Sequence, residues 1–167
     1  MLLNNWIKIY DCVTLKCGGM FMKIAICSDH RGYDLKNELV KKLLETDIAC
    51  DDYGCFNKER CDYPAFAFKV GEAVSKNECD YGIVICGSGD GVTIAANKVK
   101  GVRCICVKDC QHVVRAKEHV NVNVLAFSAE ETNAEEAFAM VKSLLSTAFL
   151  HGRYEDRTKM IDEYEKR

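Results

Sequence analysis

Hydrophobic positions along the chain follow two alternating patterns, which predict strands and helices in turn. The short continuous runs, typical of strands buried on both faces, lie at residues 23–27, 48–53, 81–86, 102–107 and 122–127. Between these runs, apolar residues recur three or four positions apart, as Leu35, Leu39 and Leu43 do, and this spacing indicates helices. The helices are expected at residues 31–45, 64–74, 92–99, 108–119, 134–148 and 155–167.

The order of these elements predicts the fold class. Five strand–helix units in a chain of 167 residues favour an α/β fold, a three-layer sandwich with a five-stranded parallel sheet covered on both faces. This domain is expected to span residues 22–167 and to end in a C-terminal helix. Residues 1–21 have no clean periodicity, so we expect a poorly ordered N-terminal extension there.

Composition and charge narrow the classes of partner. A net charge of −2 provides no global basic field for nucleic acid or an anionic membrane, and no run of 18 apolar residues could span a bilayer. The eleven cysteines are odd in number and lack paired C-x-x-C motifs. We therefore expect most of them to be small buried hydrophobic residues in a reducing cytoplasm, with no disulfides and no metal.

Candidate chemistry follows from the parallel sheet, because sites in such folds lie beyond the carboxyl ends of the strands. This rule selects Asp29–His30, Lys108–Asp109, and Cys86 with the glycine loop after it, Gly87-Ser88-Gly89-Asp90-Gly91. A strand, a glycine loop and a helix start together suit an anion. The spacing fits neither a dinucleotide fingerprint, a Walker loop nor a tyrosine-phosphatase loop. From these residues alone, Cys86 is either a reactive thiol beside an anion hole or an inert buried one.

Four segments carry a resemblance to a known family. KIAICSDHRGYDLK, DYP at 62–64, YGIVICGSGDGVTIAANKVKGVRC and EHVNVNVLAFSAE resemble the type B ribose-5-phosphate isomerases, whose pattern the subunits of galactose-6-phosphate isomerase share. The resemblance extends from Met22 to Arg167. It implies a Rossmann-like domain, a homodimer with active sites at the interface, a sugar-phosphate substrate, and neither cofactor nor metal.

The resemblance also implies roles for individual residues. Cys86 would be the base that moves a proton between C1 and C2, and the Ser88 hydroxyl would assist transfer between O1 and O2. Backbone amides would stabilise the enediolate, namely those of Gly87, Ser88, Gly89, Asp90, Gly91 and Val92. Ring opening would involve Asp29, Asp62 and His119, with Tyr63 lining the site. The phosphate would be held by His30, Arg153 and Arg157.

Without the resemblance, several of these residues have simpler interpretations. Arg153 and Arg157, four positions apart on one helical face, would be a solvated surface pair. His30 and His119 would be structural histidines, and Asp29 a helix cap, a role compatible with catalysis. His119 precedes the fifth strand and is therefore expected at its amino end, away from the cleft of its own chain. A dimer would let it reach the cleft of the partner subunit.

Some positions depart from the family pattern. Val120 stands where Asn is common in the family. Glu130 lies near a position where many members have Arg, and this difference puts a phosphate contact and the substrate preference in question. The usual Gly-Gly-Arg-His is His151-Gly152-Arg153-Tyr154 here, and Asp90 adds a carboxylate that we expect to face solvent. The sequence thus predicts isomerisation of ribose 5-phosphate to ribulose 5-phosphate through a cis-enediolate. The alternatives are a hexose-6-phosphate isomerase and a non-catalytic module that binds sugar phosphates or senses redox state through Cys86.

Overall fold

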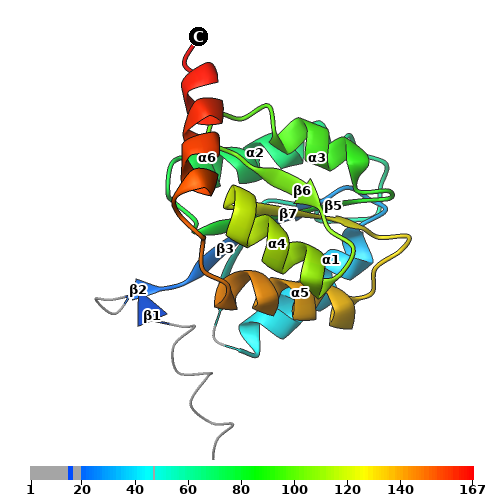
Figure 1. Cartoon of the computed structure of the whole chain (residues 1–167). Coiled ribbons are helices and arrows are strands. Elements are labelled where there is room, and N and C mark those ends of the chain that lie inside the picture. Colours follow the sequence, from blue (N-terminus) through cyan, green and yellow to red (C-terminus); the bar gives the residue numbers. More distant parts are fainter. Residues whose placement is uncertain (1–14, 17–19, 47) are drawn as a thin grey trace, which may run out of the picture.

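The computed structural model of the chain describes residues 15–16, 20–46 and 48–167. Its centre is a five-stranded sheet in the order β4-β3-β5-β7-β6, and every neighbouring pair of strands is parallel. The strands are β3 (Lys23–Ser28), β4 (Ala49–Asp52), β5 (Tyr81–Cys86), β6 (Cys104–Cys106) and β7 (Val124–Ser128). The predicted α/β fold with a parallel sheet is therefore confirmed (Figure 1).

Helices cover both faces of this sheet and complete the three layers (Figure 1). One face is covered by α1 (Tyr33–Leu44), α4 (Cys110–Val120) and α5 (Ala134–Ser146). The other face is covered by α2 (Pro64–Ser75) and α3 (Asp90–Ala96). The last helix, α6 (Arg153–Tyr164), packs against α4 rather than against the sheet.

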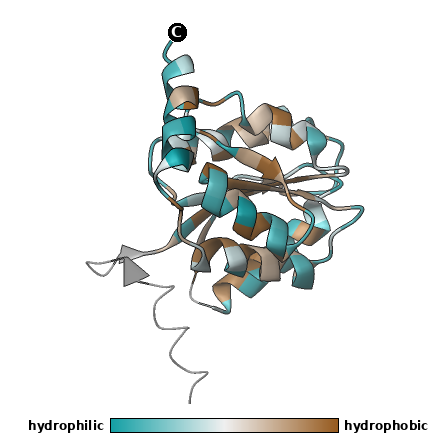
Figure 2. Ribbon diagram, in the orientation of Figure 1, coloured by the Kyte–Doolittle hydropathy of each residue, from teal (hydrophilic) through white to brown (hydrophobic). Residues whose placement is uncertain are grey.

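Side chains alternate along the strands between two hydrophobic clusters. In β5, Ile83 and Ile85 pack with α1, α4 and α5, whereas Val84 and Cys86 pack with α2 and α3. The strands are consequently apolar almost throughout, which explains why their sequences are continuous hydrophobic runs. Hydropathy colouring shows the same concentration of apolar residues in the middle layer (Figure 2).

The predicted elements are present, but some of their limits differ. The helix expected from residue 92 begins at Asp90, because Gly89 adopts a left-handed conformation with φ 81° that turns the chain directly into α3. The strand expected over 102–107 pairs only from Cys104 to Cys106, although Val102 and Val107 are buried. An apolar run indicates which residues are buried, and the buried residues extend beyond those that form the hydrogen-bonded ladder.

Only part of the predicted N-terminal extension falls within the described residues. Two short strands, β1 (Leu15–Lys16) and β2 (Met20–Phe21), pair with each other in antiparallel fashion. Residues 1–14 and 17–19 lie outside the described ranges, so the expected disorder of the extension stays a prediction.

The cysteines that the structure describes are free thiols, five of them buried and four half-buried. Burial raises the pKa of six of these thiols, to about 12 for Cys50 and Cys104 and about 11 for Cys79. The other three of the six are Cys27, Cys61 and Cys106. These six side chains are uncharged thiols at neutral pH, so they can pack as small hydrophobic residues.

A buried ion pair determines where the chain leaves β4. Lys36 of α1 is 1% exposed, and its ammonium group pairs with Asp52, the last residue of β4. Asp52 also accepts the Gly54 N–H at 2.9 Å, and the Lys36 nitrogen lies 5.3 Å from the centroid of the Phe56 ring. The pair therefore fixes the start of the segment that runs from β4 to Asp62 and Tyr63.

We expect Asp52→Asn to lower the free energy of unfolding by about 3 kcal/mol, because it leaves the buried Lys36 charge without its counter-ion while keeping an acceptor for Gly54. Urea unfolding followed by circular dichroism measures this change. Asp34→Asn is the matched control, since Asp34 pairs with Lys58 through side chains that are 69% and 64% exposed. The control should leave stability nearly unchanged. Equal losses in the two variants would contradict the role assigned to the buried pair.

Candidate active site

The carboxyl ends of the three central strands bring two of the predicted spots together. The Asp29 N–H donates to the carbonyl of Ile85 at 3.0 Å, which ties the end of β3 to the end of β5. On the other side of β5, the Ala129 N–H donates to the Cys86 carbonyl at 2.9 Å, and the Ser128 hydroxyl donates to the Gly87 carbonyl at 2.8 Å. The Asp29–His30 and Cys86 spots are thus one site at the carboxyl edge of the sheet.

The third spot has a structural role in the described chain. Lys108 and Asp109 follow β6, which is the outermost strand beyond β7. The Asp109 side chain accepts the His112 N–H at 2.7 Å and caps the amino terminus of α4. This cap explains the residue type at position 109 without any catalytic function.

The glycine loop curls over the sulfur of Cys86. Cys86 is 5% exposed, and its Sγ accepts the Gly89 N–H at 3.2 Å. Gly89 cannot be replaced without strain, because its φ is 81° and a Cβ there would lie 2.6 Å from the Cys106 sulfur. Ser88 and Asp90 are exposed, as expected for Asp90, and the Ser88 hydroxyl accepts the Asp90 N–H at 3.4 Å. The loop therefore offers a backbone donor to the Cys86 sulfur and an exposed hydroxyl at Ser88.

The segment before α2 closes the site from the other side. A Cβ on Gly91 would lie 2.8 Å from the hydroxyl oxygen of Tyr63, so the phenol packs directly against the start of α3. The Cys61 N–H donates to Nδ1 of His30 at 3.4 Å, which joins this segment to the end of β3. Asp62, between these anchors, is exposed. The structure thus places Tyr63 against the glycine loop and His30 beside the segment that carries Asp62 and Tyr63.

The interpretation of Asp29 as a helix cap is wrong, because the N-cap residue of α1 is Gly32 and no side chain caps it. Asp29 instead closes a turn that leads into the helix. It is 5% exposed, and its Oδ1 accepts the N–H groups of Arg31 at 2.9 Å and Gly32 at 3.0 Å, just before α1. These bonds orient the carboxylate at the carboxyl edge, beside the end of β5. This turn and a function in the site are geometrically compatible, because both bonds end on the same oxygen.

The remaining predicted residues form a second group. His119, in the last turn of α4, stacks on Tyr154 with ring centroids 4.5 Å apart and an interplanar angle of 5°. The guanidinium groups of Arg153 and Arg157 lie 5.0 Å and 6.0 Å from the centroid of the same Tyr154 ring. Tyr154, noted from the sequence only as a departure from a family motif, is the platform that assembles this group.

The two groups lie at opposite edges of the sheet. The chain passes from the carboxyl edge along α4 to His119 and enters β7 only at Val124, so His119 is at the amino edge. Figure 1 shows α6 on the side of the sheet away from the loop between β5 and α3. A strand of five residues separates the edges by roughly 17 Å. His119, Arg153 and Arg157 therefore do not meet Cys86 within one chain.

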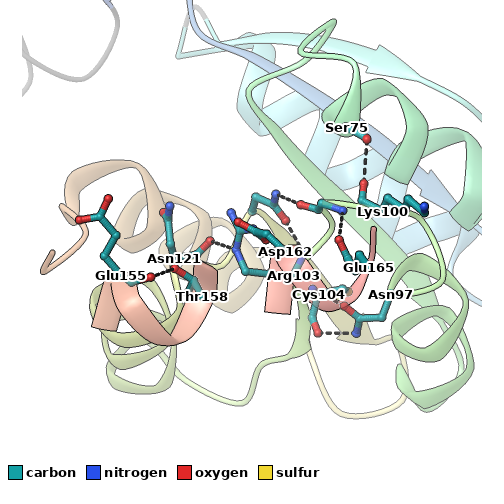
Figure 3. Close-up of polar contacts among 12 residues, drawn as sticks. Ser75, Asn97, Lys100, Arg103, Cys104, Asn121, Glu155, Thr158, Asp162 and Glu165 are labelled. Atoms are coloured by element: carbon teal, nitrogen blue, oxygen red, sulfur yellow. Dashed lines mark hydrogen bonds and ion pairs between the residues drawn. The ribbon is translucent and has the colours of Figure 1, made fainter. Parts of the chain in front are cut away.

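Polar contacts anchor α6 at this amino edge (Figure 3). The Gly101 N–H donates to the Glu165 carboxylate at 2.8 Å, and Arg103 pairs with Asp162 at 3.4 Å. Gly101 and Arg103 lie just before β6, so these contacts bind the carboxyl-terminal half of α6 to the segment that leads into this strand. Arg153, at the other end of the same helix, is positioned by these contacts.

A half-open pocket of about 310 Å³ lies beside this anchor and contains a buried lysine. Lys117 is 9% exposed and donates to the Asn121 amide oxygen at 2.7 Å. Burial, reinforced by the charge of Arg103, lowers the pKa of Lys117 to about 8. Lys117 thus differs from Lys36, whose ammonium group has a carboxylate partner.

The described residues form neither a metal-binding cluster nor a membrane-spanning helix. These residues contain no group of three or more His, Cys, Asp or Glu side chains that could hold a metal ion. Across the same ranges, each helix is too short or too polar to cross a bilayer.

Comparison with known proteins gives a consistent picture. The family model described as Ribose/Galactose Isomerase matches residues 24–161. Ribose-5-phosphate isomerase B of Escherichia coli is 38% identical over 145 residues, which cover 87% of this chain and 97% of that protein. The solved structure of ribose-5-phosphate isomerase B from Clostridium thermocellum superposes with a TM-score of 0.84 at 41% identity, covering 87% of this chain and 98% of that one.

A further solved structure carries a ligand. Ribose-5-phosphate isomerase B from Mycoplasma genitalium, with bound ribulose-5-phosphate, has a TM-score of 0.83 and 39% identity, and the match covers 88% of this chain and 98% of that one. A parallel α/β domain that matches these proteins over nearly their whole length defines a sugar-phosphate isomerase. The chain belongs to the ribose/galactose isomerase family, which confirms the resemblance and the assignment as an isomerase.

We expect the lowered pKa of Lys117 to make stability depend on pH in a defined direction. Below pH 8 the ammonium group is charged in both states, and the full cost of burying it is present. Between pH 8 and the ordinary value of 10.5 the native state loses its proton first, so stability rises with pH. The total gain is of the order of 3 kcal/mol.

The measurement compares the free energy of unfolding of the wild type and Lys117→Met from pH 7 to 10. Subtracting the two curves removes contributions from the cysteines and other shared groups. The difference should change in favour of the wild type as pH rises. A difference that is flat across this range would refute the lowering of the Lys117 pKa by burial.

Proposed function

We propose that this isomerase interconverts ribose 5-phosphate and ribulose 5-phosphate through a cis-enediolate, with Cys86 as the base. The observation that carries the proposal is the Cys86 sulfur under the glycine loop, with the Ser88 hydroxyl and the Asp29 carboxylate at the same edge. The names of the Escherichia coli and Clostridium thermocellum relatives support this substrate, as does the ribulose-5-phosphate in the Mycoplasma genitalium structure.

The proton transfer follows from the groups around the loop. The Cys86 thiolate removes the proton from C2 of the open-chain aldose, and the electron pair moves to O1 to form the enediolate. Backbone N–H groups of residues 87–92 stabilise the oxyanion, and the Ser88 hydroxyl transfers a proton between O1 and O2. The Cys86 thiol then returns its proton to C1, so the reaction needs no external acid, oxidant or reductant.

Ring opening and phosphate binding require residues from both edges of the sheet. Asp29 and Asp62 are at the carboxyl edge, where Tyr63 lines the site, and His119 completes the set for ring opening. His30 binds the phosphate with Arg153 and Arg157. Because His119 and the two arginines lie at the amino edge of their own chain, the proposal includes a homodimer in which they act in the partner's site. We also propose that the enzyme acts in the cytoplasm, in keeping with its cysteine-rich chain.

One observation favours a second substrate. Glu130, near a position where the family pattern has Arg, pairs with Arg31 beside the glycine loop, so this edge has a carboxylate where the pattern has a cation. A hexose 6-phosphate is therefore the alternative substrate for the same machinery. Rates on a panel of pentose and hexose phosphates decide between the two, and turnover of neither would favour the non-catalytic alternative.

We expect Cys86→Ala to lower the rate of ribose 5-phosphate isomerisation by about 10²–10⁴-fold, because the general base is lost. Melting temperature should change little, and inorganic phosphate should still bind. Cys106→Ala is the matched control, since the Cys106 sulfur also contacts the glycine loop, at Gly89, but has no step in the proposed reaction. The control should retain near wild-type activity. Turnover by Cys86→Ala at the wild-type rate would exclude Cys86 as the base.

The placement of His119 across the interface is tested by mixing two inactive variants. In a heterodimer of Cys86→Ala and His119→Asn chains, one of the two sites carries both intact residues. A mixture at equal concentrations should recover about a quarter of the wild-type activity after subunit exchange. Mixing Cys86→Ala with Ser88→Ala is the control, because both residues belong to the same edge and no site is intact. Equal recovery in both mixtures, or none in either with exchange confirmed by mass spectrometry, would contradict the shared site.

A further inference from the structure

Arg31 lies against the glycine loop, although neither its residue type nor its spacing marks it as a site residue. A Cβ on Gly87 would lie 2.7 Å from Nη1 of Arg31 and 2.9 Å from Cζ, so the guanidinium group covers the first residue of the loop. Its Nη2 donates to Oε1 of Glu130, the second residue after β7. A guanidinium group from the end of β3 thus spans the ends of β5 and β7.

Backbone hydrogen bonds hold both members of the Arg31–Glu130 ion pair at the site. The Glu130 N–H donates to the Gly87 carbonyl at 3.2 Å, so its backbone is bound to the residue that Arg31 covers. The Arg31 backbone N–H is bound by Asp29 at 2.9 Å. Both ends of the ion pair are therefore fixed to the site, while the side chains of Arg31 and Glu130 remain 58% and 50% exposed.

The pair is poorly suited to a purely structural task. Ion pairs between side chains this exposed contribute little to stability, because water screens the charges. A guanidinium group has five N–H donors in a planar fork, and one oxygen of Glu130 uses only part of this capacity. The remaining donors lie at the carboxyl edge, where a ligand of a parallel α/β fold binds.

The side of the strand on which Arg31 lies indicates which part of a substrate it meets. The Cys86 side chain points toward α2 and α3, whereas Glu130 leads into α5 on the opposite face. Successive residues of a strand point to opposite faces, so Arg31 on Gly87 is turned away from the thiol. In a 5-phosphopentose, the phosphate is the anionic group farthest from the reacting C1 and C2.

We propose that Arg31 is a phosphate-binding residue of the active site and that Glu130 attenuates its charge. This inference rests on the proposed function, since it takes the reacting carbons to lie at Cys86. The phosphate dianion competes with the Glu130 carboxylate for the guanidinium fork, which fits phosphate oxygens with two parallel N–H bonds. Arg31 therefore sets how strongly this edge distinguishes phosphorylated sugars from free ones.

The test uses the opposite signs that the two partners should show. Arg31→Ala should raise the KM for ribose 5-phosphate and the inhibition constant of inorganic phosphate about tenfold, with a smaller change in kcat, because a charge-assisted bond to a remote group is lost. Glu130→Gln, which frees the guanidinium group, should lower both constants. Arg31→Lys should restore part of the binding, since it keeps the charge but not the fork.

A merely structural ion pair gives a different result. Both Arg31→Ala and Glu130→Gln break the pair, so a clasp between α1 and the segment after β7 would make the two variants change in the same direction. Shifts of equal sign, or an inhibition constant for inorganic phosphate that does not move in Arg31→Ala, overturn the proposal. Melting temperatures of the variants verify that each one is folded.

Failure of the proposed function is distinguishable from failure of this inference. If the wild type isomerises no pentose phosphate, the assigned reaction is wrong, but calorimetry still gives the Kd of inorganic phosphate for the same variants. Weaker binding in Arg31→Ala and tighter binding in Glu130→Gln would then support the anion site alone. An unchanged Kd in both variants would refute it.

Discussion

The candidate site depends on the hydrogen bonds that one peptide segment, residues 85–89, makes with the ends of both neighbouring strands. The carbonyls of Cys86 and Gly87 accept donors from the segment after β7, and the end of β3 bonds to Ile85. The Gly89 N–H then turns back onto the Cys86 sulfur at 3.2 Å. Because β5 is the middle strand of the sheet, every element that contributes to the carboxyl edge is positioned relative to this segment.

The central location also explains why a single chain separates the groups that a sugar phosphate needs. A parallel sheet places the loops that follow its strands at one edge and the loops that precede them at the other. Cys86 ends β5 and Asp29 follows β3, whereas His119 precedes β7 and α6 is bound to the residues before β6. The stack of His119 on Tyr154 therefore belongs to a surface that faces away from the thiol of its own chain.

Much of the fold could be predicted from local patterns, because strands that are buried on both faces consist of continuous apolar runs. The run from Tyr81 to Cys86 matches β5 residue for residue. The start of α3 differed, because the left-handed conformation of Gly89 lets the helix begin at Asp90, two residues before the first apolar residue of its pattern.

The site could be predicted only where residues lie together in one motif. The glycine loop and Cys86 form one continuous motif, whereas Asp29 closes a turn before α1 and does not cap the helix. The ion pair of Arg31 and Glu130 joins residues 99 positions apart, and their proximity depends on the strand order. Helical spacing likewise shows that Arg153 and Arg157 share a face, but not that Tyr154 lies under both.

The protonated state of most described thiols affects how readily this protein is oxidised. Peroxides and electrophiles attack thiolates, and each increase in thiol pKa lowers the thiolate fraction at neutral pH. Burial has raised the pKa of six of the nine cysteines that the structure describes, so these side chains are slow targets. A chain with eleven cysteines can thereby use sulfur as a packing atom without becoming broadly vulnerable to oxidation.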